Sequence, residues 1–423
     1  MSSLLQAHLA KRKTGVPSGI CSVCSAHRWV IRAAAEQAAE DRSLLLIEAT
    51  SNQVNQFGGY TGMRPADFRR FVLEHVTAAD LAPEMLILGG DHLGPNPWRD
   101  LPATRAMENA AAMVREYVEA GFTKIHLDAS MSCADDPVVL PNEIVAQRTA
   151  RLCEAAEDAQ VDSECIYVIG TEVPTPGGTT HSLDEGLHVT SVMAAGETLE
   201  VHRHVFAEHG LANVWPRILA LVVQPGVEFS HESVVFYDRE RARHLSDWLR
   251  STTEGIVFEA HSTDYQLPDR YRELVEDGFA ILKVGPALTF AMREALYALE
   301  DIEGQLFSAD RRSHLSRVVD ETMMRDPKDW QSYYHGTPEQ QRLLRIYSYS
   351  DRTRYYWQKP EIEAAVERLL ANLASIAIPE TMLSRYLPAQ YERMRSRRIA
   401  ADAESIIVDR IRDVLRVFAR ACA

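Results

Sequence analysis

Short apolar runs and longer amphipathic segments alternate along the chain as far as about residue 300. Each run is rich in valine, isoleucine and leucine and ends in polar residues. Near-continuous apolar strands separated by helical segments are typical of a parallel sheet whose two faces are both covered. Eight such units predict closure into a (β/α)8 barrel, the TIM barrel, rather than an open doubly wound sheet. The eight runs are Gly19–His27, Leu44–Thr50, Leu86–Gly94, Phe122–Ser130, Ile166–Val173, Ile218–Gly226, Ile256–Asp264 and Phe279–Leu288.

The segments between the runs carry apolar residues at helical spacing. Met107–Ala120 ends just before Gly121, a residue type that commonly terminates helices. A proline opens Pro268–Asp277, as is usual at the first helical position, and Gly278 closes this segment before the eighth run. These segments are therefore predicted to be the helices that cover the barrel.

Beyond residue 300 the strand pattern stops and only helical patterns continue. The clearest of them are Ile362–Ala377 and Ala400–Ala421. We therefore predict a barrel over residues 1–300 and a helical extension, packed on the barrel, over residues 301–423.

Composition and charge limit the kinds of partner. Hydrophobic residues make up 46% and charged residues 25%, as in a globular protein with a substantial core. The formal net charge of −15 argues against a nucleic-acid partner, although a local patch could still bind a small phosphate. No eighteen consecutive apolar residues occur, and the first residues lack the apolar core of a signal peptide. We therefore expect a cytoplasmic protein without a membrane partner.

Among the six cysteines, Cys21 and Cys24 have the spacing of a redox or zinc motif. No second pair follows at zinc-finger spacing. Their apolar surroundings fit a strand better, in which the two side chains face opposite sides. We interpret them as buried, reduced thiols.

The candidate chemistry gathers at the carboxyl ends of the predicted strands, where barrel enzymes carry their reactive groups. A single polar residue there is often structural, but eight strand ends converge on one mouth. We assign Asp91, Glu48 and Asp128 as candidate catalytic carboxylates. The polar residues at the strand ends are Ser22, Ser25, His27, Glu48, Ser51, Asn52, Gln53, Asp91, His92, His126, Asp128, Ser130, Glu172, Gln224, Glu259, His261 and Lys283.

The pair Asp91-His92 has the most specific chemistry. A histidine can bind a metal while the neighbouring carboxylate transfers a proton. Glu172 and His261, on other strands, are ligand types that zinc or a similar divalent ion accepts. A structural ion pair between Asp91 and His92 is the alternative interpretation.

A phosphate site is predicted after the seventh and eighth strands, where barrels often bind phosphate through backbone N–H groups and a helix N-terminus. Arg352 and Arg354 lie among hydroxyls and aromatic residues later in the chain, although that segment also fits a helix start capped by Ser350 or Asp351. The candidate substrate and phosphate ligands are Ser25, His27, Asn52, Gln53, Ser130, Ser262, Lys283, Gly285, Thr289, Arg352 and Arg354.

Nine long motifs closely resemble the GatZ/KbaZ family, the Z subunits of class II D-tagatose-1,6-bisphosphate aldolases. The resemblance extends over nearly the whole chain, so it is highly specific. The motifs are Ile20–His27, Ile47–Gly62, Gly89–Asn96, Lys124–Ala134, Ile169–Gly178, Val222–Phe229, Glu259–Gln266, Leu282–Ala295 and Ser350–Trp357.

This resemblance implies three candidate activities. Some members are similar to non-catalytic subunits that support a separate class II aldolase chain. Others resemble D-tagatose 6-phosphate 4-epimerases, which form D-fructose 6-phosphate. An older label for such proteins is tagatose 6-phosphate kinase, which we discount because the sequence has no G-x-x-x-x-G-K-S/T loop.

A more distant similarity to the class II aldolases themselves implies a zinc cofactor. In that pattern Asp91 is the acid/base carboxylate, and His92 and His261 are ligands. The histidine of the sixth strand is replaced by Gln224, which weakens the site or changes its geometry, and Glu172 could compensate.

The first choice of function is the 4-epimerase, acting on a phosphorylated ketose in galactitol and tagatose catabolism. C4 of a 2-ketose is not α to the carbonyl, so proton abstraction there gives no stabilised carbanion. Retro-aldol cleavage of the C3–C4 bond does give a stabilised carbanion, because one fragment is an enediolate that a divalent metal can hold. The alternative is a non-catalytic subunit that stabilises an aldolase, with tagatose 1,6-bisphosphate as the sugar.

Overall fold

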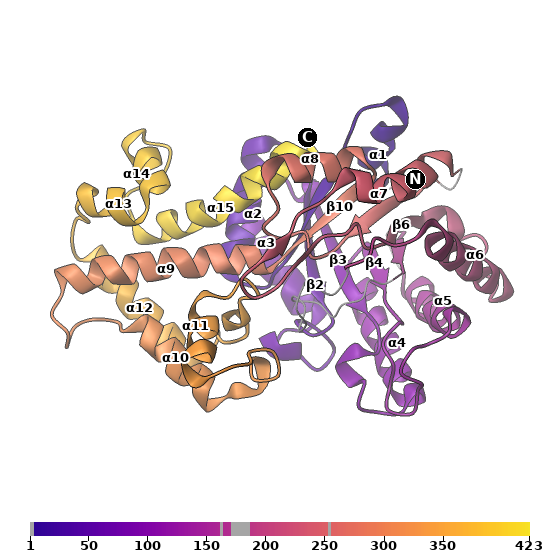
Figure 1. Ribbon diagram of the computed structural model, residues 1–423, viewed down its shortest axis with the longest axis horizontal. Helices are drawn as coiled ribbons and strands as arrows, with labels where there is room; N and C mark the ends of the chain where they lie inside the picture. The colour runs from indigo at the N-terminus through magenta and orange to yellow at the C-terminus, as the bar shows by residue number, and fades with distance from the viewer. Residues whose placement is uncertain (1–3, 161–163, 171–186, 253–254) are drawn as a thin grey trace.

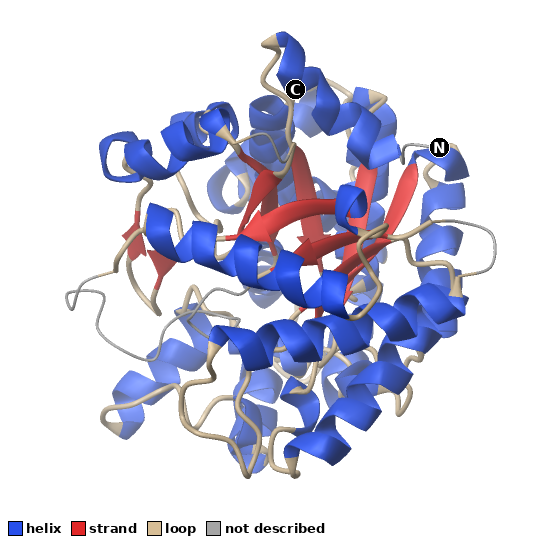
Figure 2. Cartoon of the chain, turned by 90° about the vertical axis from the view of Figure 1, so that its right-hand side faces the viewer, coloured by secondary structure: helices blue, strands red, loops and turns tan. Residues whose placement is uncertain are grey.

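The computed structural model describes residues 4–160, 164–170, 187–252 and 255–423, and it confirms the predicted barrel. Eight parallel strands close in the order β1-β10-β9-β6-β5-β4-β3-β2, and helices surround them (Figure 2). Each of the eight apolar runs contains one barrel strand. The strands are β1 (Ile20–Cys24), β2 (Leu45–Thr50), β3 (Leu86–Leu93), β4 (Lys124–Leu127), β5 (Ile166–Ile169), β6 (Ile218–Val222), β9 (Val257–Ala260) and β10 (Phe279–Val284).

Helices follow the barrel strands in turn, and a small antiparallel ribbon follows β6. Gly121 and Gly278 end their helices with positive φ angles of 89° and 107°, which explains why the sequence signalled these boundaries correctly. The ribbon consists of β7 (Glu228–Phe229) and β8 (Val234–Val235). The helices are α2 (Arg28–Asp41), α3 (Pro65–Ala78), α4 (Ala103–Glu119), α5 (Asn142–Ala159), α6 (Val192–Glu208), α7 (Arg239–Ser251), α8 (Pro268–Glu276) and α9 (Pro286–Leu306).

The C-terminal helices extend to one side of the barrel and then return to it (Figure 1). Helix α15 packs against α2, α8, α9 and strand β1, and the Gly19 N–H donates to the carbonyl oxygen of Cys422 at 3.1 Å. The last helix is therefore part of the barrel wall, and the division at residue 300 stays a prediction. These helices are α10 (Leu315–Arg325), α11 (Pro338–Tyr347), α12 (Pro360–Ala374), α13 (Glu380–Tyr386), α14 (Pro388–Arg395) and α15 (Ala403–Cys422).

The barrel interior begins with an apolar layer at its N-terminal end. Helix α1 (Leu4–Ala10) contributes Leu5 and Leu9, which are buried against the first residues of the strands. Branched apolar side chains are the usual filling of such barrels. The strand residues of this layer include Ile20, Leu46, Ile87, Ile166, Val168, Leu219, Val257 and Ile281.

An ionic layer lies in the barrel interior and reaches the C-terminal mouth. The Nζ of Lys124 lies 2.7 Å from a carboxylate oxygen of both Glu48 and Glu259. The Nζ of Lys283 lies 2.9 Å from Glu48 and 2.6 Å from Asp91. All five residues are buried. Two lysines and three carboxylates therefore share one enclosed network.

Mutual attraction keeps this layer ionised in spite of burial. Burial alone would raise the pKa of Glu259, but Lys124 and Lys283 hold it well below its usual range. Burial would likewise lower the pKa of Lys124, but Glu259 and Glu48 raise it. Gly89 makes room for the network, because a Cβ there would lie 2.6 Å from Cγ of Glu48.

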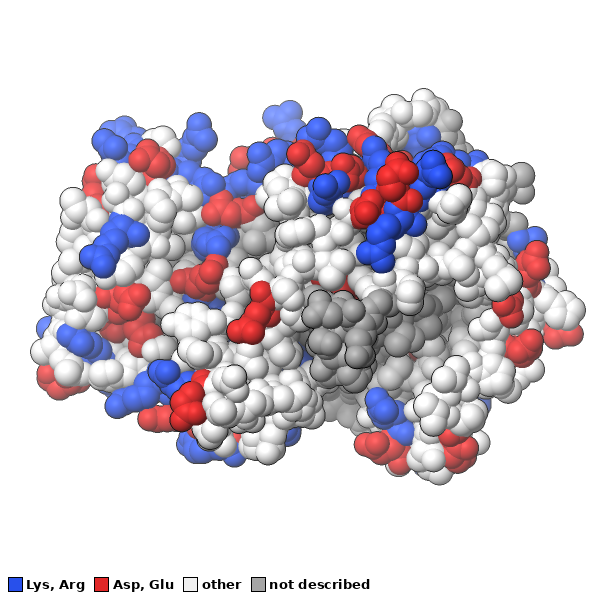
Figure 3. Space-filling view, in the orientation of Figure 1, with Lys and Arg blue, Asp and Glu red and all other residues white. Residues whose placement is uncertain are grey.

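The molecular surface mixes charges of both signs. Lysine, arginine, aspartate and glutamate side chains are interspersed on the face shown in Figure 3. All six cysteines are free. No helix in the described part of the chain has the length and apolar character needed to cross a membrane.

Replacing Lys124 by methionine should strongly destabilise the barrel. The change leaves Glu48 and Glu259 short of a counter-charge in an enclosed interior, and breaking a buried ion pair costs about 3–5 kcal/mol. Urea denaturation measures the loss in free energy of unfolding. The double variant Lys124→Met/Glu259→Gln should recover part of it, since one of the unpaired charges is removed. A single variant as stable as the wild type would show that the layer contributes little.

Candidate active site

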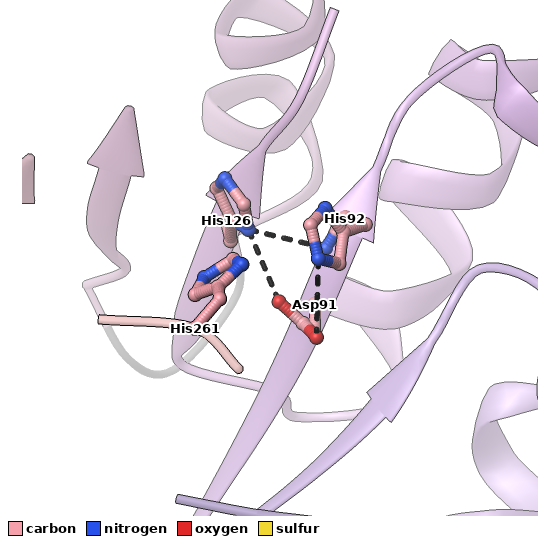
Figure 4. A group of neighbouring side chains, drawn as sticks. All are labelled: Asp91, His92, His126 and His261. Atoms are coloured by element: carbon pink, nitrogen blue, oxygen red, sulfur yellow. Dashed lines mark hydrogen bonds and ion pairs between the residues drawn. The ribbon is translucent and has the colours of Figure 1, made fainter. Parts of the chain in front are cut away.

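Three histidines and one aspartate meet at the mouth of the barrel (Figure 4). Asp91 and His92 come from β3, His126 from β4, and His261 directly follows β9. All four are buried, and one potential ligand atom of each lies within 4.8 Å of the others. Three imidazoles and a carboxylate form a donor set that suits zinc and related divalent ions.

A bulge at the end of β3 turns two neighbouring residues toward this group. Gly90 pairs with Ile125 and Leu93 with Leu127, so three steps along β3 match two along β4. In a regular strand consecutive side chains point to opposite faces, but a bulge re-aims one of them. His92 accordingly has a left-handed backbone, with φ of 48°.

Close contact with the neighbouring strand requires a glycine just after the bulge. A Cβ on Gly94 would lie 1.7 Å from the carbonyl oxygen of Asp128. The Asp128 N–H donates to the Leu93 carbonyl at 3.1 Å. This approach places the carboxylate of Asp128 beside His92.

Two of the histidines are oriented by carboxylates. His92 Nδ1 lies 2.8 Å from Asp128 Oδ2, and His261 Nε2 lies 3.0 Å from Glu259 Oε1. A ring nitrogen that donates to a carboxylate leaves the lone pair of the other nitrogen available for a metal. Nε2 of His92 and Nδ1 of His261 are the nitrogens left in this way. Metal-binding histidines in proteins are usually held by such partners.

The third histidine is oriented by a backbone carbonyl. Nε2 of His126 lies 3.1 Å from the carbonyl oxygen of Gly170, so this nitrogen carries the proton. Nδ1 then accepts from the His92 N–H at 3.2 Å and lies 3.1 Å from Asp91 Oδ1. Two atoms that bear lone pairs thus face each other, an arrangement that a cation stabilises. The residues therefore fit a metal ion, provided that Nδ1 of His126 exchanges the hydrogen bond from the His92 N–H for the ion.

The charges of the group are set by its neighbours. Burial would raise the pKa of Asp91, but His92 and Lys283 hold it well below its usual range. Burial would lower the pKa of His92, but Asp91 and Asp128 raise it. Burial dominates at His261 and lowers its pKa to about 4. Asp91 is therefore ionised, and His261 is neutral at pH 7, as a metal ligand must be, whereas a metal ion at His92 would compete with a proton.

Two further residues of the expected metal site, Glu172 and Gln224, have different outcomes. Glu172 lies outside the described residues. The Oε1 of Gln224 accepts from the N–H groups of Gly226 at 2.7 Å and Val227 at 2.9 Å, so it holds the loop after β6. The sequence analysis placed His126 among the strand-end residues but not among the ligands. The feature of the sequence that could have identified His126 as a ligand is its position near the end of an apolar run, like that of His92 and His261.

The other two candidate catalytic carboxylates, Glu48 and Asp128, lie outside the four-residue group and support it. Glu48 belongs to the ionic layer, where Ser22 Oγ also donates to it at 2.7 Å. Asp128 orients His92 and also accepts a hydrogen bond from Ser130 Oγ at 2.6 Å. The hydroxyl of the predicted substrate residue Ser130 is therefore engaged with Asp128.

Several predicted substrate residues line one small cavity of about 40 Å³ beside the group. Cys24 also lines it, and its Sγ lies 3.8 Å from Asp91 Oδ2. Cys24 therefore lies between this cavity and the candidate base. The predicted residues around it are Ser25, His27, Gln53, Gly285, Thr289 and Arg354.

The remaining predicted ligands lie elsewhere. Asn52 is exposed. Ser262 follows His261 with a left-handed φ of 50° and is partly exposed. Arg352 stacks on the ring of Tyr333, with its guanidinium carbon 3.5 Å from the ring centroid. Lys283 belongs to the ionic layer.

Comparison with known proteins identifies the family of the chain. Residues 5–423 match the family described as D-tagatose-1,6-bisphosphate aldolase subunit GatZ/KbaZ-like. The chain belongs to this family. The solved structure of a probable tagatose 6 phosphate kinase from Sinorhizobium meliloti 1021 is 50% identical to this GatZ/KbaZ-like chain, with a TM-score of 0.89. The match covers 96% of this chain and 100% of that chain.

Two solved aldolase structures match the GatZ/KbaZ-like chain more distantly. The YdjI aldolase from Escherichia coli K12 is 11% identical, with a TM-score of 0.44, over 89% of this chain and 100% of that chain. The fructose-bisphosphate aldolase from Campylobacter jejuni is 14% identical, with a TM-score of 0.46, over 89% of this chain and 95% of that chain. Similarity this low says nothing about the chemistry of this family member.

The purified GatZ/KbaZ-like protein should carry about one divalent ion per chain, since its three histidines form one donor set. His92→Ala and His261→Ala should each lower metal content, measured by plasma mass spectrometry. His202→Ala is the matched control: this histidine is also buried, but in α6, where it contacts the Thr198 carbonyl. Equal metal content in the wild type and in both site variants would remove these histidines from any metal site.

Proposed function

We propose that this protein is a D-tagatose 6-phosphate 4-epimerase, which interconverts that sugar and D-fructose 6-phosphate in galactitol and tagatose catabolism. The observation that carries the proposal is the carboxylate of Asp91 beside three converging histidines and within 2.6 Å of Lys283. Membership of the GatZ/KbaZ-like family supports chemistry on a tagatose phosphate. The Sinorhizobium relative, whose name includes tagatose 6 phosphate, supports the monophosphate as the sugar.

Inversion at C4 is reached by breaking and remaking the C3–C4 bond. Asp91 takes the proton from the C4 hydroxyl, C4 becomes an aldehyde carbon, and the electron pair of the broken bond enters an enediolate. The aldehyde fragment rotates and presents its other face. The enediolate then attacks that face, and Asp91 returns its proton to the C4 oxygen. Atoms and electrons balance without an oxidant.

The residues of the site serve this chemistry in distinct ways. A divalent ion held by His92, His126 and His261, which we propose to be zinc, would supply an electrophile for the ketose oxygens. Lys283, 2.6 Å from Asp91, favours the ionised base at the start of the reaction. Burial of the group keeps water from protonating the enediolate.

Phosphoryl transfer is not proposed, although the name of the Sinorhizobium relative includes kinase. The sequence lacks the glycine-rich G-x-x-x-x-G-K-S/T loop that cradles nucleotide phosphates.

A supporting subunit of an aldolase is the second candidate. Gln224 favours it, because this residue stands where a class II aldolase would have a third histidine and its side-chain oxygen is engaged by its own loop. The family description, which names an aldolase subunit, agrees with it.

Turnover by the isolated chain distinguishes the two functions. With zinc present, the protein alone should convert D-tagatose 6-phosphate to D-fructose 6-phosphate, and Asp91→Asn should reduce the rate by about 10²–10⁴-fold, as loss of a general base does. The three histidines remain available for metal in this variant. Asp402→Asn, which changes only the cap of α15, should keep full activity. A coupled assay for fructose 6-phosphate measures both rates.

The subunit function predicts the opposite result. The isolated chain would then be inert with every divalent metal tried, and it would raise the activity or thermal stability of an added class II aldolase chain. That pair of results would exclude the epimerase.

A further inference from the structure

The first turn of α9 lies where a barrel of this kind would hold a phosphate. Barrels often bind phosphate through the loops after the seventh and eighth strands and a helix N-terminus. Here these strands are β9 and β10, and α9 begins directly after Gly285. Lys283, two residues earlier, contacts Asp91, so this turn borders the candidate active site.

A carboxylate of the chain itself already occupies this turn. Oδ1 of Asp264 accepts from the N–H of Gly285 at 3.1 Å and from the N–H of Ala287 at 2.8 Å. Asp264 is only 3% exposed. It follows His261 by three residues, a span of at most about 10 Å. Two of the N–H groups that would bind phosphate oxygens therefore bind an internal anion.

A second carboxylate takes up the neighbouring donors. The Thr289 hydroxyl donates to Asp351 Oδ2 at 2.5 Å, and Arg293 lies 2.7 Å from Asp351 Oδ1. Burial raises the pKa of Asp264 to about 6, although the N–H groups of Ala287 and Gly285 and the charge of Arg354 act in the opposite direction, so the carboxylate is mostly ionised at pH 7. The Thr289 hydroxyl and Arg293 are thus matched to a carboxylate of the chain, whereas Arg354 donates to backbone carbonyl oxygens and to the Tyr355 hydroxyl.

We propose that Asp264 is a specificity-determining residue, whose carboxylate stands in for a phosphate at the first turn of α9 and restricts the site to ketose monophosphates. The proposal rests on the proposed function. A bound ketose that spans the mouth presents one of its ends to α9. A monophosphate can bring its hydroxyl end there and donate a hydrogen bond to Asp264. A 1,6-bisphosphate carries a phosphate at each end, so in either orientation one phosphate meets the carboxylate.

Removal of this carboxylate should open a phosphate site. Calorimetric titration compares D-tagatose 6-phosphate, D-tagatose 1,6-bisphosphate and inorganic phosphate as ligands. The wild type should bind the monophosphate at least about tenfold more tightly than the bisphosphate. Asp264→Ala should bind the bisphosphate and inorganic phosphate about 10–100-fold more tightly than the wild type, because it frees two N–H donors for a charged acceptor.

Asp402→Ala is the matched control. It removes a capping carboxylate from the start of α15, where Asp402 accepts from the Ser405 N–H. Its affinity for all three ligands should equal that of the wild type. An equal gain in this variant would show that any uncapped helix captures phosphate, and it would overturn the role of Asp264.

Other outcomes are equally decisive. Equal affinity of the wild type for the two sugars would overturn the proposal, as would a folded Asp264→Ala protein that gains no affinity for phosphate. If that variant does not fold, Asp264→Asn keeps the acceptor oxygen but loses the charge, and it must still raise affinity for the bisphosphate. If the wild type binds neither sugar, the proposed function fails, while inorganic phosphate still tests Asp264.

Discussion

The ionic layer inside the barrel is the interaction on which the site depends. Lys283 contacts Glu48 within the layer and Asp91 at the mouth, so the candidate base belongs to the same network as the core. Glu259 has a similar double role, because it pairs with Lys124 and also orients His261. In an enclosed interior each of these charges requires its partners, since an unpaired buried charge is strongly destabilising. The stability of the barrel and the ionisation of the site therefore have a common origin.

Backbone irregularity converts this charged interior into a convergent site. A regular β3 would direct Asp91 and His92 to opposite faces of the strand. The bulge beside β4 brings both to the mouth, and Gly94 lets the strand approach the Asp128 carbonyl. His92 then lies within hydrogen-bond distance of Asp128, which orients its ring. Strained backbone is tolerated here because strong contacts on both sides of the strand hold it in place.

The site also differs from a simple anion-binding barrel mouth. The predicted phosphate ligands Gly285 and Thr289 are present at the first turn of α9, but Asp264 and Asp351 occupy their donors. Family membership establishes the lineage of the chain, whereas we propose that these internal carboxylates bear on which sugar it accepts. On that proposal, local negative charge limits substrate choice at a helix N-terminus that would otherwise favour any anion.

The sequence alone determined the barrel, because eight apolar runs with helical segments between them have few other ways to bury both faces of a sheet. It also located Asp91, His92 and His261, since parallel strands place their carboxyl ends together. The tertiary structure decided the rest. It brought His126 into the group, engaged Gln224 in its own loop and filled the first turn of α9 with Asp264. Periodicity shows where a side chain can lie, but whether its hydrogen-bonding atoms are already used depends on residues distant in the sequence. Only the folded chain brings those partners within bonding distance.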